Sequence, residues 1–134
     1  MKKILILLLS MSLLTSCSDD DSNSSDGTQI VGKWYLESVR SVGGDNLLNE
    51  CNQDSFIQFN TDGTANSEFY GDSSGECEIE SDDSGDWKFE GGNNYTFYVP
   101  YFEEDTTGSV NFTSDNQFIF TSPDLPGVEI VFEK

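Results

Sequence analysis

Residues 30–42, Ile-Val-Gly-Lys-Trp-Tyr-Leu-Glu-Ser-Val-Arg-Ser-Val, decide how the rest of the chain folds. Trp34 and Leu36 share one face of this stretch, and charged or polar side chains alternate with them. Alternation with a period of two residues is typical of a β-strand in a sheet with one solvated face. We expect this stretch to be the first strand, with a bend along its length, and we expect later strands to curl round onto Trp34.

The remaining folded part repeats this alternation in short stretches separated by turn residues such as Gly63, and no helical period lasts beyond one turn. Residues 123–127 contain Pro-Asp-Leu-Pro-Gly, a turn that we expect no strand to absorb. About eight strands joined by hairpin-length links predict an all-β, antiparallel up-and-down barrel or a sandwich. The stretches behind this approximate count cover residues 30–42, 56–60, 66–70, 77–80, 86–90, 95–101, 110–112, 118–120 and 128–133.

Length and composition predict one folded, strongly acidic domain. The chain has 134 residues, with 6 basic and 25 acidic side chains and a formal net charge of −19. Loss of Lys2 and Lys3 with a signal peptide leaves four basic residues and a net charge of −21. Such a field repels phosphate, so nucleic-acid binding is disfavoured. Ten Phe, five Tyr and two Trp are too many for a disordered coil.

The N-terminus predicts an address outside the cytoplasm. Two lysines precede an apolar run that ends at Leu14, as in a secretory signal peptide, and the run is shorter than the roughly 20 residues of a membrane span. Leu14-Thr15-Ser16-Cys17 resembles the bacterial lipoprotein box. That resemblance implies cleavage after residue 16 and a lipidated Cys17. The alternative is an ordinary signal peptide with Cys17 as a spare thiol.

Residues 17–29 predict a tether. Residues 18–27 contain no apolar side chain and cannot pack, so we expect a flexible acidic spacer. Acidic residues directly after Cys17 also resemble the export signal of some Gram-negative lipoproteins. We therefore expect a lipid-anchored protein of the bacterial outer membrane, on its periplasmic or cell-surface face, although a purely soluble spacer explains the composition as well.

Once Cys17 is lipidated, Cys51 and Cys77 remain in a compartment where disulfides persist, and we expect them to pair. The pair would close a loop between the second strand and the weakly patterned region around residues 71–80. The alternative of a redox-active pair lacks the close spacing and neighbouring cation that lower a thiol pKa.

No residue pattern predicts catalysis, so we expect no enzyme, no catalytic residue and no cofactor. The chain has no histidine, which removes the commonest general base and the usual nitrogen ligand of zinc. Most acidic residues fall in loops or on polar strand faces. Calcium is the more reasonable metal, at either of two acidic clusters, but neither matches an EF-hand and a solubilising surface is the favoured interpretation. The clusters are Asp82, Asp83 and Asp86, and Glu103, Glu104 and Asp105.

Gly32-Lys33-Trp34 resembles the Gly-x-Trp signature of the lipocalins. Cys51, the run 59–64, Cys77 and the run 85–87 follow in an order similar to the lipocalin-like domains of small bacterial lipoproteins. The resemblance covers residues 30–134 and implies an eight-stranded antiparallel barrel, with Gly32 and Trp34 at its closed end and the disulfide at the two cysteines. It also implies a late basic residue over Trp34, for which the chain offers Lys134. A purely structural core role is the alternative for Trp34.

These observations predict three segments: a signal peptide over 1–16, a lipidated tether over 17–29 and a lipocalin-like barrel over 30–134. The expected function is non-catalytic binding of a small apolar or amphipathic ligand by a monomer attached to the membrane through its acyl chains. The alternative is a structural or interaction lipoprotein with a filled barrel, which binds calcium or docks a partner through its acidic face. Candidate cavity residues are Phe59, Trp87, Tyr95, Phe97, Phe112 and Phe120.

Overall fold

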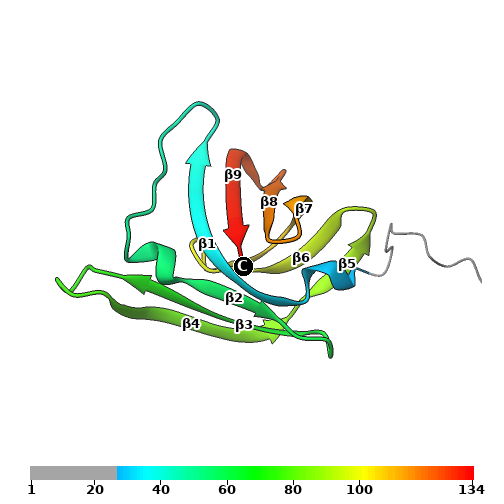
Figure 1. Ribbon diagram of the computed structural model, residues 1–134, viewed down its shortest axis with the longest axis horizontal. Coiled ribbons are helices and arrows are strands. Elements are labelled where there is room, and N and C mark those ends of the chain that lie inside the picture. Colours follow the sequence, from blue (N-terminus) through cyan, green and yellow to red (C-terminus); the bar gives the residue numbers. More distant parts are fainter. Residues whose placement is uncertain (1–26) are drawn as a thin grey trace, which may run out of the picture.

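The computed structural model describes residues 27–134, and over these residues nine strands form one antiparallel sheet (Figure 1). Their order across the sheet is β4-β3-β2-β1-β9-β8-β7-β6-β5. The strands are β1 (Gly32–Ser41), β2 (Phe56–Phe59), β3 (Thr64–Gly71), β4 (Glu78–Asp86), β5 (Lys88–Gly91), β6 (Asn94–Val99), β7 (Glu104–Ser114), β8 (Gln117–Ser122) and β9 (Leu125–Glu133). Two short 3₁₀ turns, η1 (Thr28–Ile30) and η2 (Asn52–Asp54), precede β1 and β2.

The all-β, up-and-down, lipocalin-like fold is confirmed, with one difference in strand count. Residue 87 separates β4 from β5, and both run in the same direction, so they act as one bent strand. Trp87 holds the bend, because its backbone N–H donates to the Gly63 oxygen at 2.9 Å and its indole Nε1 donates to the Asn60 oxygen at 2.9 Å. β4 therefore pairs with β3, β5 pairs with β6, and the described sheet is left open between β4 and β6.

The first strand has the predicted faces. Trp34 and Leu36 are fully buried, whereas Tyr35 is 41% exposed. The expected bend is a β-bulge at Glu37, between Leu36 and Ser38. The carbonyl oxygen of Glu37 accepts hydrogen bonds from the side-chain amides of Asn46 at 3.3 Å and Gln53 at 2.9 Å, so side chains satisfy the backbone that leaves the ladder there.

The prediction that no strand could absorb residues 123–127 is wrong, because β9 begins at Leu125 and contains Pro126 and Gly127. Pairing between β9 and β1 starts only at Val128, opposite Ser41. Proline lacks a backbone donor, so it is tolerated where the neighbouring ladder has not yet begun.

Two other strands extend by six residues beyond one end of their predicted ranges. β4 extends to residue 86 and β7 begins at residue 104, although neither added stretch shows an apolar alternation. Pairing with β3 and β6, respectively, holds these polar stretches in the sheet. The prediction missed them because it relied on apolar side chains, whereas ladder hydrogen bonds come from the backbone.

The inner face of the curled sheet forms the core, which is rich in aromatic side chains. The largest fully buried side chains are Trp34, Phe59, Phe97, Phe118, Phe120, Phe132, Ile30, Leu36, Ile57, Ile130, Val39 and Val99.

No helix in residues 27–134 is long and apolar enough to cross a membrane.

Candidate functional site

One end of the barrel, which we call the closed end, is packed around Trp34 near the start of β1. The indole Nε1 donates to the Ile30 carbonyl oxygen at 2.7 Å, and its ring packs edge-on to Phe118 with centroids 4.7 Å apart. Phe112 lies 6.0 Å away on the same side. The fully buried indole thus has its donor paired and its ring packed, so Trp34 is a core residue. Its role in closing this end of the barrel stays a prediction.

Lys134 covers Trp34, with its Nζ 4.8 Å from the ring centroid. Gly32 makes room for this side chain: a Cβ there would meet Lys134 Cε at 3.4 Å and Nζ at 3.5 Å. Its φ of +132° is also a conformation that L side chains rarely adopt. The Gly-x-Trp pattern therefore has a local physical reason, and Lys134 takes the position that the resemblance implied for a basic residue.

Gly27 packs against the barrel although it lies three residues before the expected boundary at Ile30. Gly27 is buried, and its carbonyl oxygen accepts a hydrogen bond from the Tyr95 hydroxyl at 3.2 Å. A Cβ at Gly27 would lie 2.6 Å from Phe89 Cγ, so only glycine fits against that ring. Gly27, which was expected in the tether, therefore belongs to the packed closed end, whereas Thr28 and Gln29 are exposed. Cys17 and the signal peptide lie outside the described residues.

Aromatic rings fill the interior above the closed end. Phe59 on β2 contacts Phe97 on β6, with centroids 5.1 Å apart, and Phe97 contacts Phe120 on β8 at 4.6 Å. Because β2 and β6 lie far apart in the sheet order, this chain of rings crosses the lumen. All three side chains are at most 1% exposed.

The other candidate cavity residues flank this chain of rings. Trp87 is half-buried and lies 5.8 Å from Phe59 and 6.2 Å from Tyr95, centroid to centroid. Phe112 is half-buried beside Trp34. The structure therefore brings Phe59, Trp87, Tyr95, Phe97 and Phe120 into one connected cluster and places Phe112 at the closed end. Their role as ligand contacts stays a prediction.

A second group of half-buried rings lies at the opposite end of the barrel, which we call the mouth. Phe69 near the end of β3 contacts Tyr101 with centroids 6.0 Å apart, and Tyr101 contacts Phe102 at 4.9 Å. Strands β1, β3 and β6 run in the same direction, so the ends of β3 and β6 lie away from Trp34. These three residues, the mouth trio, were not among the predicted ligand contacts. Tyr101 and Phe102 sit in a tight turn, which apolar periodicity does not detect.

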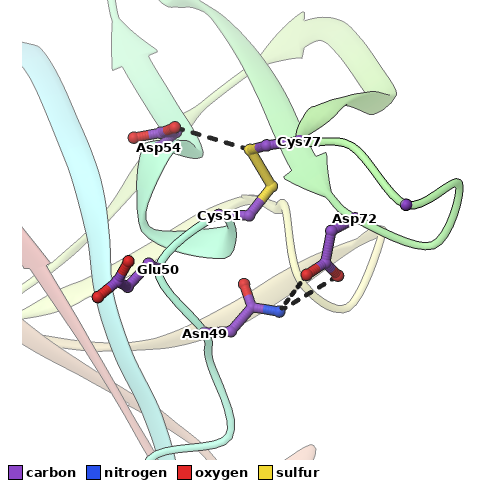
Figure 2. Close-up of a pocket in the computed structure, with 7 residues that line it drawn as sticks. Asn49, Glu50, Cys51, Asp54, Asp72 and Cys77 are labelled. Carbon is purple, nitrogen blue, oxygen red and sulfur yellow. Dashed lines mark hydrogen bonds between the residues drawn. A yellow bond between two sulfur atoms is a disulfide. The ribbon is translucent and has the colours of Figure 1, made fainter.

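The disulfide between Cys51 and Cys77 is confirmed and braces the mouth. Figure 2 shows it within an open surface depression whose other walls carry Glu50, Asp54 and Asp72. The Asn49 side-chain amide donates to both carboxylate oxygens of Asp72 at 3.3 Å, which ties the loop before η2 to the loop after β3.

The two acidic clusters considered for calcium lie on different strands. Asp82, Asp83 and Asp86 belong to β4, whereas Glu104 and Asp105 begin β7 just after Glu103. No group of three or more potential ligands able to hold a metal occurs within residues 27–134.

Asp83 interacts across the open side of the sheet. Burial raises the pKa of its carboxyl, and repulsion from Asp105 and Asp82 raises it further. Burial likewise raises the pKa of the Tyr98 hydroxyl, with added repulsion from Glu103 and Asp83 among its acidic neighbours. The acidic residues of β4 and those at the start of β7 therefore repel each other.

Comparison with known proteins identifies the family. The family model described as a lipocalin-like domain matches residues 30–121, which is more than half of the chain. Strand β9 lies beyond the matched residues, yet it completes the sheet between β8 and β1. No curated protein and no solved structure matches the chain. With its up-and-down strand order, its Gly32 and Trp34 closed end and this match, the chain belongs to the lipocalin-like domain family.

Proposed function

We propose that this protein is a lipid-anchored, extracytoplasmic binding protein for a small apolar or amphipathic ligand, without catalytic activity. The observation that carries the proposal is the contrast between the two ends of a ligand-binding type of fold. Trp34 and Lys134 close one end, whereas Phe69, Tyr101 and Phe102 leave half-buried rings at the other. Half-buried aromatic surface at a barrel mouth suits an apolar ligand.

The position of the ligand follows from the filled interior. The ring chain through Phe59, Phe97 and Phe120 occupies the lumen, so a ligand would bind above it and contact the mouth trio. Phe97 and its neighbours would then form the floor of the site. The acidic loops around the mouth would disfavour anionic ligands, since a net charge of −21 repels them.

A second candidate function is a structural or interaction lipoprotein that carries no ligand. It is favoured by the same ring chain, because an eight-stranded barrel can be filled by its own side chains. In that case the acidic outer surface would be the functional part of the molecule.

Native mass spectrometry separates the two candidates. A secreted form beginning at Ser18 would be measured before and after incubation with a lipid and metabolite extract. A reproducible added mass that disappears on organic extraction is the expected result. A bare polypeptide mass, two hydrogens light for the disulfide, would contradict ligand binding and favour the interaction protein.

Mutation of the mouth locates the ligand. Substitution of Tyr101 and Phe102 together by alanine should weaken binding of the extracted ligand by about tenfold or more, since two ring contacts are lost. Val42→Ala is the matched control, because Val42 is 76% exposed and follows β1 at the same end. Circular dichroism would verify that both variants fold. Equal affinity of both variants would place the ligand elsewhere.

The anchor is tested separately. Cys17 is the cysteine positioned for lipidation, so Cys17→Ala should abolish incorporation of labelled palmitate and release the protein from membranes. Membrane fractionation with Ser16→Ala as the control measures this effect, since that change keeps a small residue before the cysteine. Continued acylation of the Cys17→Ala protein would contradict the proposed address.

A further inference from the structure

Neither candidate function names a specific contact on the open side of the sheet. We call this side the seam: it lies between β4 (Glu78–Asp86) and residues 97–99 of β6. β4 pairs with β3 along its whole length but has no partner on its other edge. β5 covers β6 only as far as Thr96, so the last three residues of β6 also lack a partner on this side.

An unpaired edge presents backbone N–H and C=O groups to any extended chain. Such an edge is a template for strand addition, and proteins normally cover it or close it. Here Trp87 holds the base of the seam against the β2–β3 turn through its two hydrogen bonds. The seam therefore runs from Trp87 toward the mouth, and the nine-residue strand β4 has one unpaired edge along it.

Charge disfavours closure of the seam, because the acidic residues of β4 repel those at the start of β7. β4 carries five acidic residues and no basic one. Across the seam, Asp105 of β7 is close enough to Asp83 to raise its pKa, and Tyr98 of β6 is within the field of Asp82 and Asp83. Bringing β4 and β6 to ladder distance would press these like charges together.

We propose that the free edge of β4 binds an extended, lysine- or arginine-rich peptide segment by β-strand addition. The backbone edge supplies the hydrogen bonds, and the carboxylates of β4 and the β7 start supply the preference for basic side chains. The interaction uses the outside of the barrel and does not depend on a ligand at the mouth.

The same charges disfavour the other occupants. A second copy of this chain would place five more acidic residues against the first five, and a nucleic acid would bring phosphates. A basic peptide instead neutralises the carboxylates on both sides of the seam. Its length should match β4, at about nine residues.

The test compares peptides on the full-length, lipidated protein in neutral detergent. A ten-residue peptide of alternating lysine and threonine is measured by fluorescence anisotropy at about 50 mM salt, where screening is weak. The same peptide with alternate backbone nitrogens methylated keeps its charge but cannot complete a ladder. We expect the unmodified peptide to bind at least about tenfold more tightly. Equal binding of both peptides would reduce the interaction to simple charge attraction and overturn the proposal.

Hydrogen exchange locates the contact. Within residues 78–86, the amides that point away from β3 should exchange quickly in the free protein and become protected when the unmodified peptide is bound. Protection of these amides in the free protein would mean that the seam is closed in solution or covered by a second copy, and either result would overturn the proposal. Peptide binding that leaves these amides unprotected would also overturn it.

Charge variants give an independent readout. Neutralising Asp82 and Asp83 together as asparagines should weaken peptide binding by about tenfold, because both flank the free edge. The matched control replaces Asp62 and Asp115 by asparagine as well. These two residues lie in the β2–β3 and β7–β8 turns, so peptide binding should be nearly unchanged. A similar loss in both variants would show that overall charge, and not the seam, attracts the peptide.

Discussion

The two ends of this barrel are built from different kinds of contact. At the closed end, Trp34 has ring neighbours from β7 and β8, a hydrogen bond to Ile30 and a cation over its face. At the mouth, the contacts between Phe69, Tyr101 and Phe102 are fewer, and a covalent bond between Cys51 and Cys77 restrains the nearby loops.

The two ends therefore differ in rigidity and in exposure to solvent. Packing that is complete on all sides resists local opening, whereas half-buried rings and polar strands open more easily. The closed end can therefore hold the fold together while the mouth and the seam stay available to other molecules. Four experiments test this difference between the two ends.

The largest effect is expected at the closed end. Trp34→Ala should lower the free energy of unfolding by about 3–5 kcal/mol, because it removes a fully buried ring and its hydrogen bond. Urea denaturation measures this loss. Trp87→Ala is the control: Trp87 is half-buried, so its removal should cost less. A loss below about 1 kcal/mol for Trp34→Ala would place that residue outside the core.

Removing the disulfide should weaken the other end. Replacement of both Cys51 and Cys77 by alanine frees a loop of sequence separation 26 and should lower stability by about 3.5 kcal/mol on the chain-entropy model. Hydrogen exchange should rise first around residues 72–80 and last around Trp34. Uniform acceleration over the whole domain would show that the two ends do not differ in local stability.

Backbone strain at the mouth predicts a smaller, opposite effect. Glu103 has a φ of +55° in the turn between β6 and β7, where its N–H and that of Phe102 bond to the Val99 oxygen. Glu103→Gly should raise stability by up to about 1 kcal/mol, because glycine adopts this conformation without the usual penalty. Glu104→Gly, at the start of β7, should instead destabilise. Thermal unfolding of both variants measures the difference, and a loss in the first would contradict the strain.

The smallest effect concerns charge at the seam. The folded state raises the pKa of Asp83 above the ordinary 3.8, so protonation of Asp83 stabilises the folded protein. This stabilisation is complete below pH 3.8 and is lost as the pH rises through the raised pKa. Asp83→Asn should therefore stabilise the protein at pH 7 by a few tenths of a kcal/mol, because solvent screens most of the repulsion.

Denaturation from pH 3 to pH 7 measures this pH dependence. The difference between Asp83→Asn and the unmodified protein should vanish at the acidic end of the range, where Asp83 is already neutral. A constant difference at every pH would assign the effect to packing.

Much of the fold could be predicted because its signals are local. Alternation around Trp34 identified β1 and its faces, and two remaining cysteines identified the disulfide. Proline at residue 126 misled the prediction, since its effect depends on whether a neighbouring strand needs its N–H. The polar part of β4 was missed because no apolar pattern marks a strand held by one neighbour.

The candidate site was less predictable for a related reason. Aromatic side chains on inward positions could be recognised, but whether Phe59 and Phe97 line a cavity or fill it depends on the curvature that brings β2 and β6 across the lumen. The mouth trio and the facing acidic residues require contacts between segments distant in the chain.

The residues alone predict an all-β chain with an acidic surface, a first strand with Trp34 on its buried face and a disulfide between the last two cysteines, because alternation, charge and covalent pairing are properties of the residues themselves. The sequence could not predict that aromatic rings cross the lumen or that the described sheet stays open between β4 and β6. The physical reason is that strand curvature, register and repulsion between Asp83 and Asp105 arise only when distant strands are brought together.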